Sequence, residues 1–403
     1  MTKRNSIFNV KRYQTAKLDI LPKMVQIMRS RGKKNNVIVR CVFIKISHVD
    51  TVNERYYADV FLEAKWSDPS LENGKNEENE EDFSKYWNPR MYIENCFGEI
   101  KETISREIVF YSEEPTKGFI IEKHRIKAMF HETLELRQFP FDCQDLSIIL
   151  TSELSYDELE FSESSTELSR INEHAEVDSQ EWDLHKHVEV SITDILSDCN
   201  VGPVKRPSIK FTCRVSRRFG YFIINNFLIS ILLCLLAFSS LAVSPQNTFG
   251  RLQLCMIILL TTVTFKVAVS QNLPKISYLT YLDKAILGNI VIIICLCIWH
   301  AVISHMFEDA IFQNSTATEL SNTRQQILNL RHQENILLIT FILGYSFVVL
   351  LFILVIYFDA GARRKKMHLK DKQFMKKLEQ LYDDQKHQPI SSSLIPFFAS
   401  KTV

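Results

Sequence analysis

Four long apolar stretches in the second half of the sequence constrain its fold more than any other feature: residues 221–243, 252–270, 285–304 and 336–358. Each is close to the ~20 residues that a helix needs to cross roughly 30 Å of hydrocarbon. Within hydrocarbon the backbone must satisfy its own hydrogen bonds, so the stretches are expected to be helical. The sequence therefore predicts an all-α bundle of four membrane-spanning helices.

The second stretch is the natural candidate to line a pore. It is the least apolar of the four and carries Gln253, Thr261, Thr262, Thr264 and Lys266. Polar groups in a membrane span usually face the bundle interior or water rather than lipid. The alternative is an ordinary packed span whose polar side chains bond to neighbouring helices.

The spacing within residues 252–270 and just beyond them supports the pore interpretation. Six residues recur at intervals of four and three, which places them on one face of a helix. Around a five-fold axis this face would form rings that are polar at both ends and apolar in the middle. Apolar rings can close a pore by excluding water, so Leu260 is the predicted gate; Lys266 lies off the stripe and is expected at a subunit interface or near the headgroups. The predicted pore-lining residues are Gln253, Ile257, Leu260, Thr264, Val267 and Gln271.

The first half of the chain is predicted to be a β-sandwich. It contains many short runs of alternating or β-branched residues that are separated by polar turns, which is typical of that architecture. Residues 24–31 are expected to form a short helix and residues 72–85 an acidic, solvated loop. The expected strands are 37–47, 56–66, 106–111, 118–130, 145–151, 182–192 and 208–216.

Charge and motif content argue against several classes of function. The formal net charge is +1, so no basic domain is available to bind nucleic acid. The sequence has no nucleophile elbow, phosphate-binding loop or paired-carboxylate site, so we expect no enzyme activity and no cofactor. His185 and His187 alternate on one strand, and His131 or His174 could join them around a metal. We expect these histidines to be solvent-exposed and predict no metal site.

Five motifs occur in a characteristic order between and beside these elements. Together with the four apolar stretches, they resemble the Cys-loop, or pentameric ligand-gated ion channel, family over roughly residues 20–358. The motifs are Trp66-Ser67-Asp68, Trp87-Asn88-Pro89 with Asn95, Phe139-Pro140-Phe141-Asp142 with Gln144, Arg217–Phe222, and Leu273–Tyr278 with Asp283.

The resemblance implies an architecture and a function. It implies a mainly-β, immunoglobulin-like extracellular sandwich of about ten strands at residues 1–217. The pore domain would be residues 218–358 with a linker at 305–335, and residues 359–403 a basic amphipathic tail. The chain would be a subunit of a homo- or hetero-pentamer, a multi-pass protein of the plasma membrane that binds a small-molecule agonist and conducts inorganic ions.

The sequence also departs from the family pattern. Most animal members close the signature loop with a disulfide, but the matching positions here are Glu132 and Leu146. Packing of Phe139 and Phe141 is therefore expected to hold this loop. Ile229 stands where the first membrane helix usually has proline.

The resemblance places ligand between subunits, in a box of aromatic side chains that attracts cationic amines. The matching positions carry Phe61, Glu94 and Tyr156, whereas the capping hairpin expected at 193–207 has no aromatic residue. This composition favours an unfamiliar ligand, or none, over a familiar amine transmitter.

Motion of the sandwich is expected to reach the pore through one junction. The tip of the signature loop, the turn at residues 48–52 and Arg217 would press on the linker at 273–284. Arg217 is expected to pair with Asp142 or Asp50, because a charge pair at a partly dry interface can bias a two-state element. The predicted gating residues are Asp50, Phe139, Pro140, Phe141, Asp142, Arg217 and Pro274.

Ion preference and sidedness are less clearly encoded. Residues 248–251 lack both the glutamate of most cation-selective members and the Pro-Ala pair of anion-selective ones; the Arg217 and Leu273 motifs look closest to the anion-conducting branch. The basic run 363–366 and the sequon at Asn314 indicate an inverted orientation with both termini inside the cell, whereas the more specific family resemblance implies that both termini lie outside. The tail carries one apolar helical face that suits an anionic membrane surface; its residues are Met367, Phe374, Leu378 and Leu381.

Two other functions remain open at this point. An accessory or non-conducting subunit would explain the poor aromatic box, although the intact pore stripe argues against it. A membrane-anchored binding module would have no use for that stripe.

Overall fold

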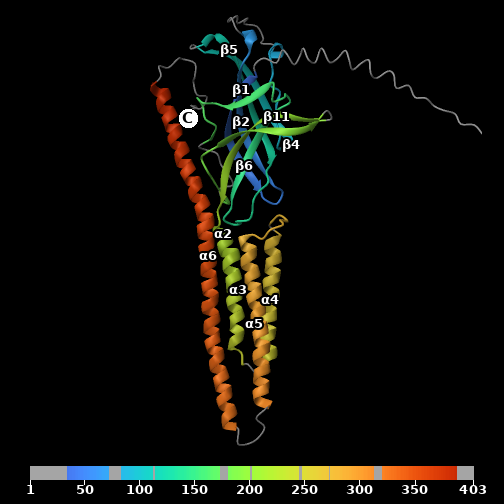
Figure 1. Ribbon diagram of the computed structural model, residues 1–403, viewed down its shortest axis with the longest axis vertical. Coiled ribbons are helices and arrows are strands. Elements are labelled where there is room, and N and C mark those ends of the chain that lie inside the picture. The colour runs from blue at the N-terminus through green and yellow to red at the C-terminus, as the bar shows by residue number, and fades with distance from the viewer. Residues whose placement is uncertain are drawn as a thin grey trace, which may run out of the picture.

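The computed structural model describes residues 34–71, 83–111, 114–172, 180–199, 202–244, 247–271, 273–312 and 320–387. These residues form a β-sandwich above a bundle of long helices (Figure 1). The predicted helix at 24–31, His174 and Asn314 lie outside the described residues, as does most of the acidic loop at 72–85. The end of that loop forms the 3-10 turn η2 (Phe83–Lys85), and η1 (Pro69–Leu71) precedes it.

The sandwich has eleven strands in two sheets, which confirms the predicted architecture of about ten strands. One sheet has the order β4-β5-β2-β1-β7, with β8 also paired to β1; the other has the order β10-β11-β6-β3, with β9 paired to β11. The predicted run 182–192 is interrupted, because β9 ends at Leu184 and β10 starts at Glu189. The strands are β1 (Asn35–Asp50), β2 (Arg55–Ser67), β3 (Met91–Ile93), β4 (Cys96–Tyr111), β5 (Glu114–His131), β6 (Cys143–Ser152), β7 (Leu159–Glu163), β8 (Arg170–Ile171), β9 (Trp182–Leu184), β10 (Glu189–Cys199) and β11 (Gly202–Arg217).

Alternation along the strands builds the core between the sheets. Successive side chains in a strand point to opposite faces, so every second residue of β2 from Tyr56 to Trp66 is buried. They pack against residues of the opposite sheet, among them Ile148 and Phe211. The hydroxyl of Tyr56 is satisfied inside the core, because it donates to the carbonyl of Ser147 at 2.7 Å.

Four helices are long and apolar enough to cross a membrane, as the sequence predicts. The first is continuous in space but changes its hydrogen-bond pattern along its length. Asn247 begins the second, because its side chain accepts a hydrogen bond from the amide of Gly250 at 3.0 Å. The segments are α2 (Gly220–Phe222), η3 (Ile223–Leu228), α3 (Ile229–Phe238), η4 (Ser239–Ala242), α4 (Thr248–Ser270), α5 (Tyr281–Phe312) and α6 (Leu320–His387).

The last helix corrects the interpretation of the C-terminal tail. α6 has 68 residues, which at 1.5 Å per residue is about 100 Å and far longer than a membrane span requires. Its apolar part is residues 336–358, and the helix continues past Phe358 without a break beside the sandwich (Figure 1). Leu378 and Leu381 face the sandwich across a cavity that Arg40 and Leu168 also line. The apolar face of the tail therefore lies against protein rather than on a membrane surface.

Candidate functional site

The loop between β5 and β6 joins the sandwich to the helices, and Gln144 holds it closed. The side-chain oxygen of Gln144 accepts from the amide of Glu135, and its Nε2 donates to the carbonyl of the same residue, both at 3.0 Å. The same Nε2 donates to Asp142 at 2.6 Å. Gln144 thus fixes both the width of the loop and the carboxylate at its tip.

Glu132 replaces the missing disulfide at the base of this loop. Its Oε2 accepts from the backbone amide of Ser147 at 3.0 Å and from the Ser147 hydroxyl. Lys210 lies 3.8 Å from the other oxygen. Hydrogen bonds between Glu132 and Ser147 therefore close the loop near the place where related chains carry a disulfide.

Replacing Glu132 tests this closure. Burial raises the pKa of Glu132, although hydrogen bonds from Ser147 and the charge of Lys210 oppose the shift. A carboxyl with a raised pKa contributes most stability below its unfolded pKa and loses that contribution as pH rises through the folded pKa. We therefore expect Glu132→Gln, which keeps an acceptor without the charge, to melt no lower than wild type at pH 7. Glu132→Val leaves the Ser147 amide unpaired and should cost about 1–3 kcal/mol, measured as thermal unfolding in detergent; equal melting of both variants would contradict this role.

Two motifs that the sequence singled out brace the sandwich. The indole nitrogen of Trp66 donates to the carbonyl of Trp87 at 3.2 Å, and the amide of Trp87 donates to Asp68 at 2.8 Å. The side chain of Asn95 donates to the carbonyl of Ser147 at 2.7 Å. These residues have structural roles in the described part of the chain.

Arg217, the last residue of β11, lies at the centre of the junction. Its side chain is 2 % exposed and that of Asp142 is 1 %, and Arg217 Nε lies 3.0 Å from Asp142 Oδ1. Nη1 reaches Glu181 at 2.8 Å, and the guanidinium lies 4.1 Å from the ring centroid of Trp182. The positive charge of Arg217 is therefore shielded from water and balanced by the carboxylates of Asp142 and Glu181.

Of the two acids considered as partners of Arg217, the structure pairs it with Asp142. Asp50 instead accepts from the amides of Val52 and Asn53 and from the Asn53 side chain within the β1–β2 turn. The Asn53 side chain is the main reason that the pKa of Asp50 lies below its usual value. Asp50 thus shapes the turn between β1 and β2.

Phe139 and Phe141 at the loop tip pack into the top of the helix bundle. The ring of Phe139 lies 4.8 Å from that of Phe222 and belongs to a buried cluster with Leu282 and Ile286. Phe141 lies 5.2 Å from Phe219. Residues after α4 join the same contact: Leu273 and Ile276 pack on this cluster, with Pro274 half-buried between them. The peptide bond before Pro140 is cis.

The continuation of α6 also contributes to the junction, which sequence reasoning missed. Asp359 accepts from Gln138 Nε2 at 2.8 Å and from the hydroxyl of Tyr281. Arg364 donates to the carbonyl of Arg217 at 2.7 Å, and its guanidinium lies 4.7 Å from the ring centroid of Phe219. The basic run at 363–366 is the sequence feature that could have indicated this contact, but nothing in the sequence identifies the residues that the run meets.

Five of the six predicted pore-lining residues lie on one exposed face of α4, and the sixth, Gln271, is the C-cap residue directly after the helix. Ile257, Leu260 and Val267 are 54 %, 66 % and 53 % exposed, and Gln253, Thr264 and Gln271 are exposed as well. The buried residues of α4 fall on the opposite side of the helix at 3.6 residues per turn: Arg251, Cys255, Ile258 and Thr262. One face of α4 therefore packs on its own chain, and the predicted stripe is left free.

The inner end of α4 is fixed by an ion pair that sequence reasoning also missed. Arg251 is 1 % exposed, and its guanidinium meets Glu334 of α6 through two hydrogen bonds of 2.6 and 3.2 Å. The same guanidinium donates to the carbonyl of Val243 at 2.6 and 2.8 Å. The charge of Arg251 is therefore paired inside the chain.

The predicted ligand-binding residues occupy separate places on one chain. Tyr156 lines a cavity of about 280 Å³ beneath the β10–β11 hairpin, together with Ile192 and Pro207. Phe61 is half-buried in β2 of the other sheet, and Glu94 is exposed between β3 and β4. Neither Phe61 nor Glu94 lines that cavity.

The expectation that His185 and His187 are solvent-exposed is wrong. They are 5 % and 4 % exposed, because α6 covers the sandwich at this point and Asp371 contacts both rings. His131 is not part of this group; its Nδ1 lies 2.9 Å from the carbonyl of Glu54.

A comparison with protein families agrees with this architecture. The model of the neurotransmitter-gated ion-channel ligand binding domain matches residues 20–219. The match contains every described strand of the sandwich and ends one residue before α2 begins at Gly220.

Proposed function

Because the chain belongs to the neurotransmitter-gated, or pentameric ligand-gated, ion channel family, we propose that it forms a ligand-gated channel whose pore is lined by α4. The family consists of receptors that bind ligand, assemble as oligomers and act as ion channels rather than enzymes. The chain is accordingly a multi-pass protein of the plasma membrane, with an extracellular sandwich and four spans. In our proposal residues 1–217 sense ligand, residues 218–358 conduct, and residues 359–403 connect the two.

The observation that carries the pore assignment is the free face of α4. Gln253, Leu260 and Thr264 lie opposite the buried side of α4, on which Ile258 packs against α3 and α5. A stripe that its own chain leaves uncovered, with polar ends and an apolar centre, suits water on a pore axis better than lipid. Ile257 and Val267 complete the apolar part on either side of Leu260.

A matched pair of cysteine substitutions tests this assignment. Thr264 is on the exposed stripe, whereas Thr262, two residues earlier, is fully buried on the opposite face. In a channel that conducts, Thr264→Cys should make the current sensitive to a small charged thiol reagent, reducing it by more than half, and Thr262→Cys should not. Because the chain has nine native cysteines, the unsubstituted channel gives the baseline. Block at Thr262→Cys alone would refute the assignment.

We propose that ligand binds between subunits. Tyr156 beside the hairpin would supply one side of the site, and Phe61 on the next subunit the other, with Glu94 near the rim. The separation of these residues on one chain supports a site that two chains complete. The lack of aromatic residues from 183 to 210 argues against a familiar amine agonist.

We propose anions as the conducted ions. The residues around the inner mouth offer no acidic ring, and the resemblance of the Arg217 and Leu273 motifs to anion-conducting members supports this choice. Arg251 adds no free charge to the pore, since Glu334 neutralises it.

An accessory subunit is the second candidate, and the missing aromatics of the hairpin favour it. Native mass spectrometry of the purified chain separates the alternatives. A complex of five times the 47.0 kDa chain mass supports a homomeric channel, whereas a monomer favours the accessory subunit or a membrane-anchored binding module. Conduction only on co-expression with another family member would identify the accessory role.

A further inference from the structure

The part of α6 beyond the membrane is fastened to the sandwich by polar contacts that centre on Asp371. Oδ1 of Asp371 accepts from the amides of Lys186 and His187 at 3.0 and 3.2 Å and from His187 Nδ1 at 2.6 Å. Oδ2 meets a single partner in the described residues, His185 Nδ1, at 2.8 Å. Lys370 pairs with Glu189 at 3.0 Å. These contacts place one helix face against the segment between β9 and β10.

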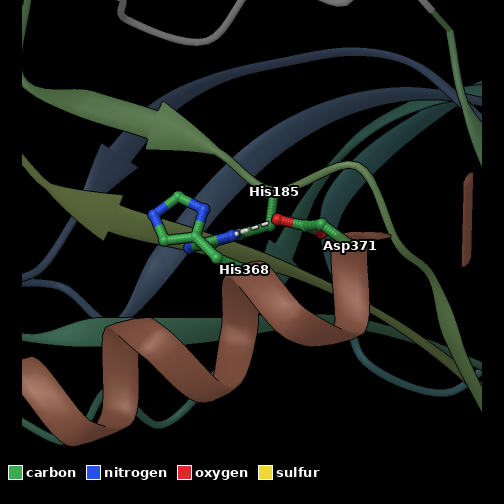
Figure 2. Close-up of side chains that lie close together, drawn as sticks. All are labelled: His185, His368 and Asp371. Atoms are coloured by element: carbon green, nitrogen blue, oxygen red, sulfur yellow. Dashed lines mark hydrogen bonds and ion pairs between the residues drawn. The ribbon is translucent and has the colours of Figure 1, made fainter. Parts of the chain in front are cut away.

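His368 lies on the same face, three residues before Asp371 and therefore one helical turn away. The ring centroids of His368 and His185 are 5.5 Å apart. Figure 2 shows both helix residues directed toward His185 of the sandwich. Ligand atoms of His185, His368 and Asp371 lie within 4.8 Å of one another, so the two histidines and the carboxylate form one compact cluster.

His185 has a free coordinating position. Its side chain is 5 % exposed, and its Nε2 is buried without a hydrogen-bond partner among the described residues. With the proton on Nδ1, donated to Asp371, the lone pair of Nε2 remains unused. A histidine held by a carboxylate through one nitrogen and open at the other is the usual arrangement of a metal-binding histidine in proteins. A buried acceptor without a partner is also costly, so an ion at Nε2 would remove that cost.

We propose that His185, His368 and Asp371 form a binding site for a transition-metal cation of the Zn²⁺ class. His185 and His368 supply nitrogen ligands, and Asp371 holds the His185 ring and supplies negative charge. Nitrogen donors of this kind suit Zn²⁺ or Co²⁺, whereas Ca²⁺ and Mg²⁺ require oxygen ligands. The bound ion joins α6 to the segment between β9 and β10. Because β10 leads into the hairpin over the Tyr156 cavity, the ion strengthens the contact between the tail and the sensor.

Cobalt and zinc titrations of the full-length protein in detergent test the site. Co²⁺ bound to nitrogen and oxygen ligands gives visible absorption bands, which unbound Co²⁺ in water gives only weakly. We expect saturation near one Co²⁺ per chain, displacement by Zn²⁺, and no competition from Mg²⁺. His368→Ala should weaken binding at least ~10-fold, since even loss of an outer-shell partner typically costs about 10–100-fold in metal affinity, and the exposed position of His368 makes misfolding a poor explanation.

His332→Ala is the matched control, since His332 is an exposed histidine elsewhere on α6. It should bind Co²⁺ as wild type does. Equal loss in both variants, or wild-type protein without saturable binding, would overturn the proposal. Asp371→Asn keeps the shape of the side chain and should weaken Zn²⁺ binding as well; unchanged affinity in that variant would exclude Asp371 from the site. Because the readout is metal binding, these results are independent of whether the channel conducts.

Discussion

Replacing Leu260 with serine is expected to produce a standing membrane current without any ligand. Leu260 is the most exposed apolar residue of the stripe, with Ile257 and Val267 on either side. A closed pore would bury its side chain against the same residue of neighbouring chains, and serine would both remove that contact and admit water. Burying a leucine side chain stabilises a structure by about 1.5–3 kcal/mol. If serine removes half of that stabilisation in each of five chains, the total loss approaches the roughly 5.5 kcal/mol that inverts a 1:99 equilibrium between open and closed states.

The measurement is whole-cell current in cells that express the chain at their surface. Replacing external chloride by a large organic anion should shift the reversal potential if anions permeate, and replacing sodium should shift it if cations do. Leu259→Ser is the matched control, because Leu259 is the adjacent leucine and packs on the neighbouring helices instead. Surface-expressed Leu260→Ser protein without current would favour the accessory subunit. An equal leak from Leu259→Ser would show that loosened packing, rather than a wetted gate, opens the pore.

The fold could be predicted from the sequence where the signal is local. Period-two alternation in β1 and β2 reflects burial of one face, and the four spans follow from apolar length alone. The stripe on α4 could be found because the residues that share a face recur by three and four. Each of these features depends on neighbours within one element.

Contacts between distant elements could not be predicted in this way. Arg251 and Glu334 are 83 residues apart and His185 and Asp371 are 186 apart; neither pairing leaves a local pattern. The histidines were expected at the surface because nothing near them in the sequence indicates that α6 covers them. The position of the tail depends on α6 remaining helical beyond the membrane, and its amphipathic face fits either a membrane or a protein surface.

The same contacts account for the charge pattern that favoured an inverted orientation. Basic residues after the last span would ordinarily indicate the cytoplasmic side. In the structure Arg364 binds the carbonyl of Arg217, and Lys370 pairs with Glu189 of the sandwich. Because these positive charges bind groups of the sandwich, they do not indicate the cytoplasmic side. The extracellular placement of the sandwich is therefore kept.

Separating Arg217 from Asp142 is expected to have the second large effect. Both side chains are almost fully buried, with Asp142 also bonded to Gln144 and Arg217 also bonded to Glu181. Removing one charge leaves the other without its main partner, which typically costs about 3–5 kcal/mol. Arg217→Gln and Asp142→Asn should therefore each lower the melting temperature of the purified protein by on the order of 10 °C. The double variant, which buries neither charge, should recover part of that loss.

The neighbouring pair Arg218–Asp183 provides a matched control at the same junction. These side chains are 2.7 Å apart but 51 % and 56 % exposed, and such surface pairs contribute about 0–1 kcal/mol. Arg218→Gln should therefore leave melting almost unchanged.

In a Leu260→Ser background, which reports on the gate without ligand, the Arg217 and Asp142 variants should change the size of the leak and Arg218→Gln should not. If Arg217→Gln and Asp142→Asn left both melting and leak at control values, singly and together, the buried pair could not couple the sensor to the pore, and the contacts of Phe139, Phe141 and α6 would have to do so without it.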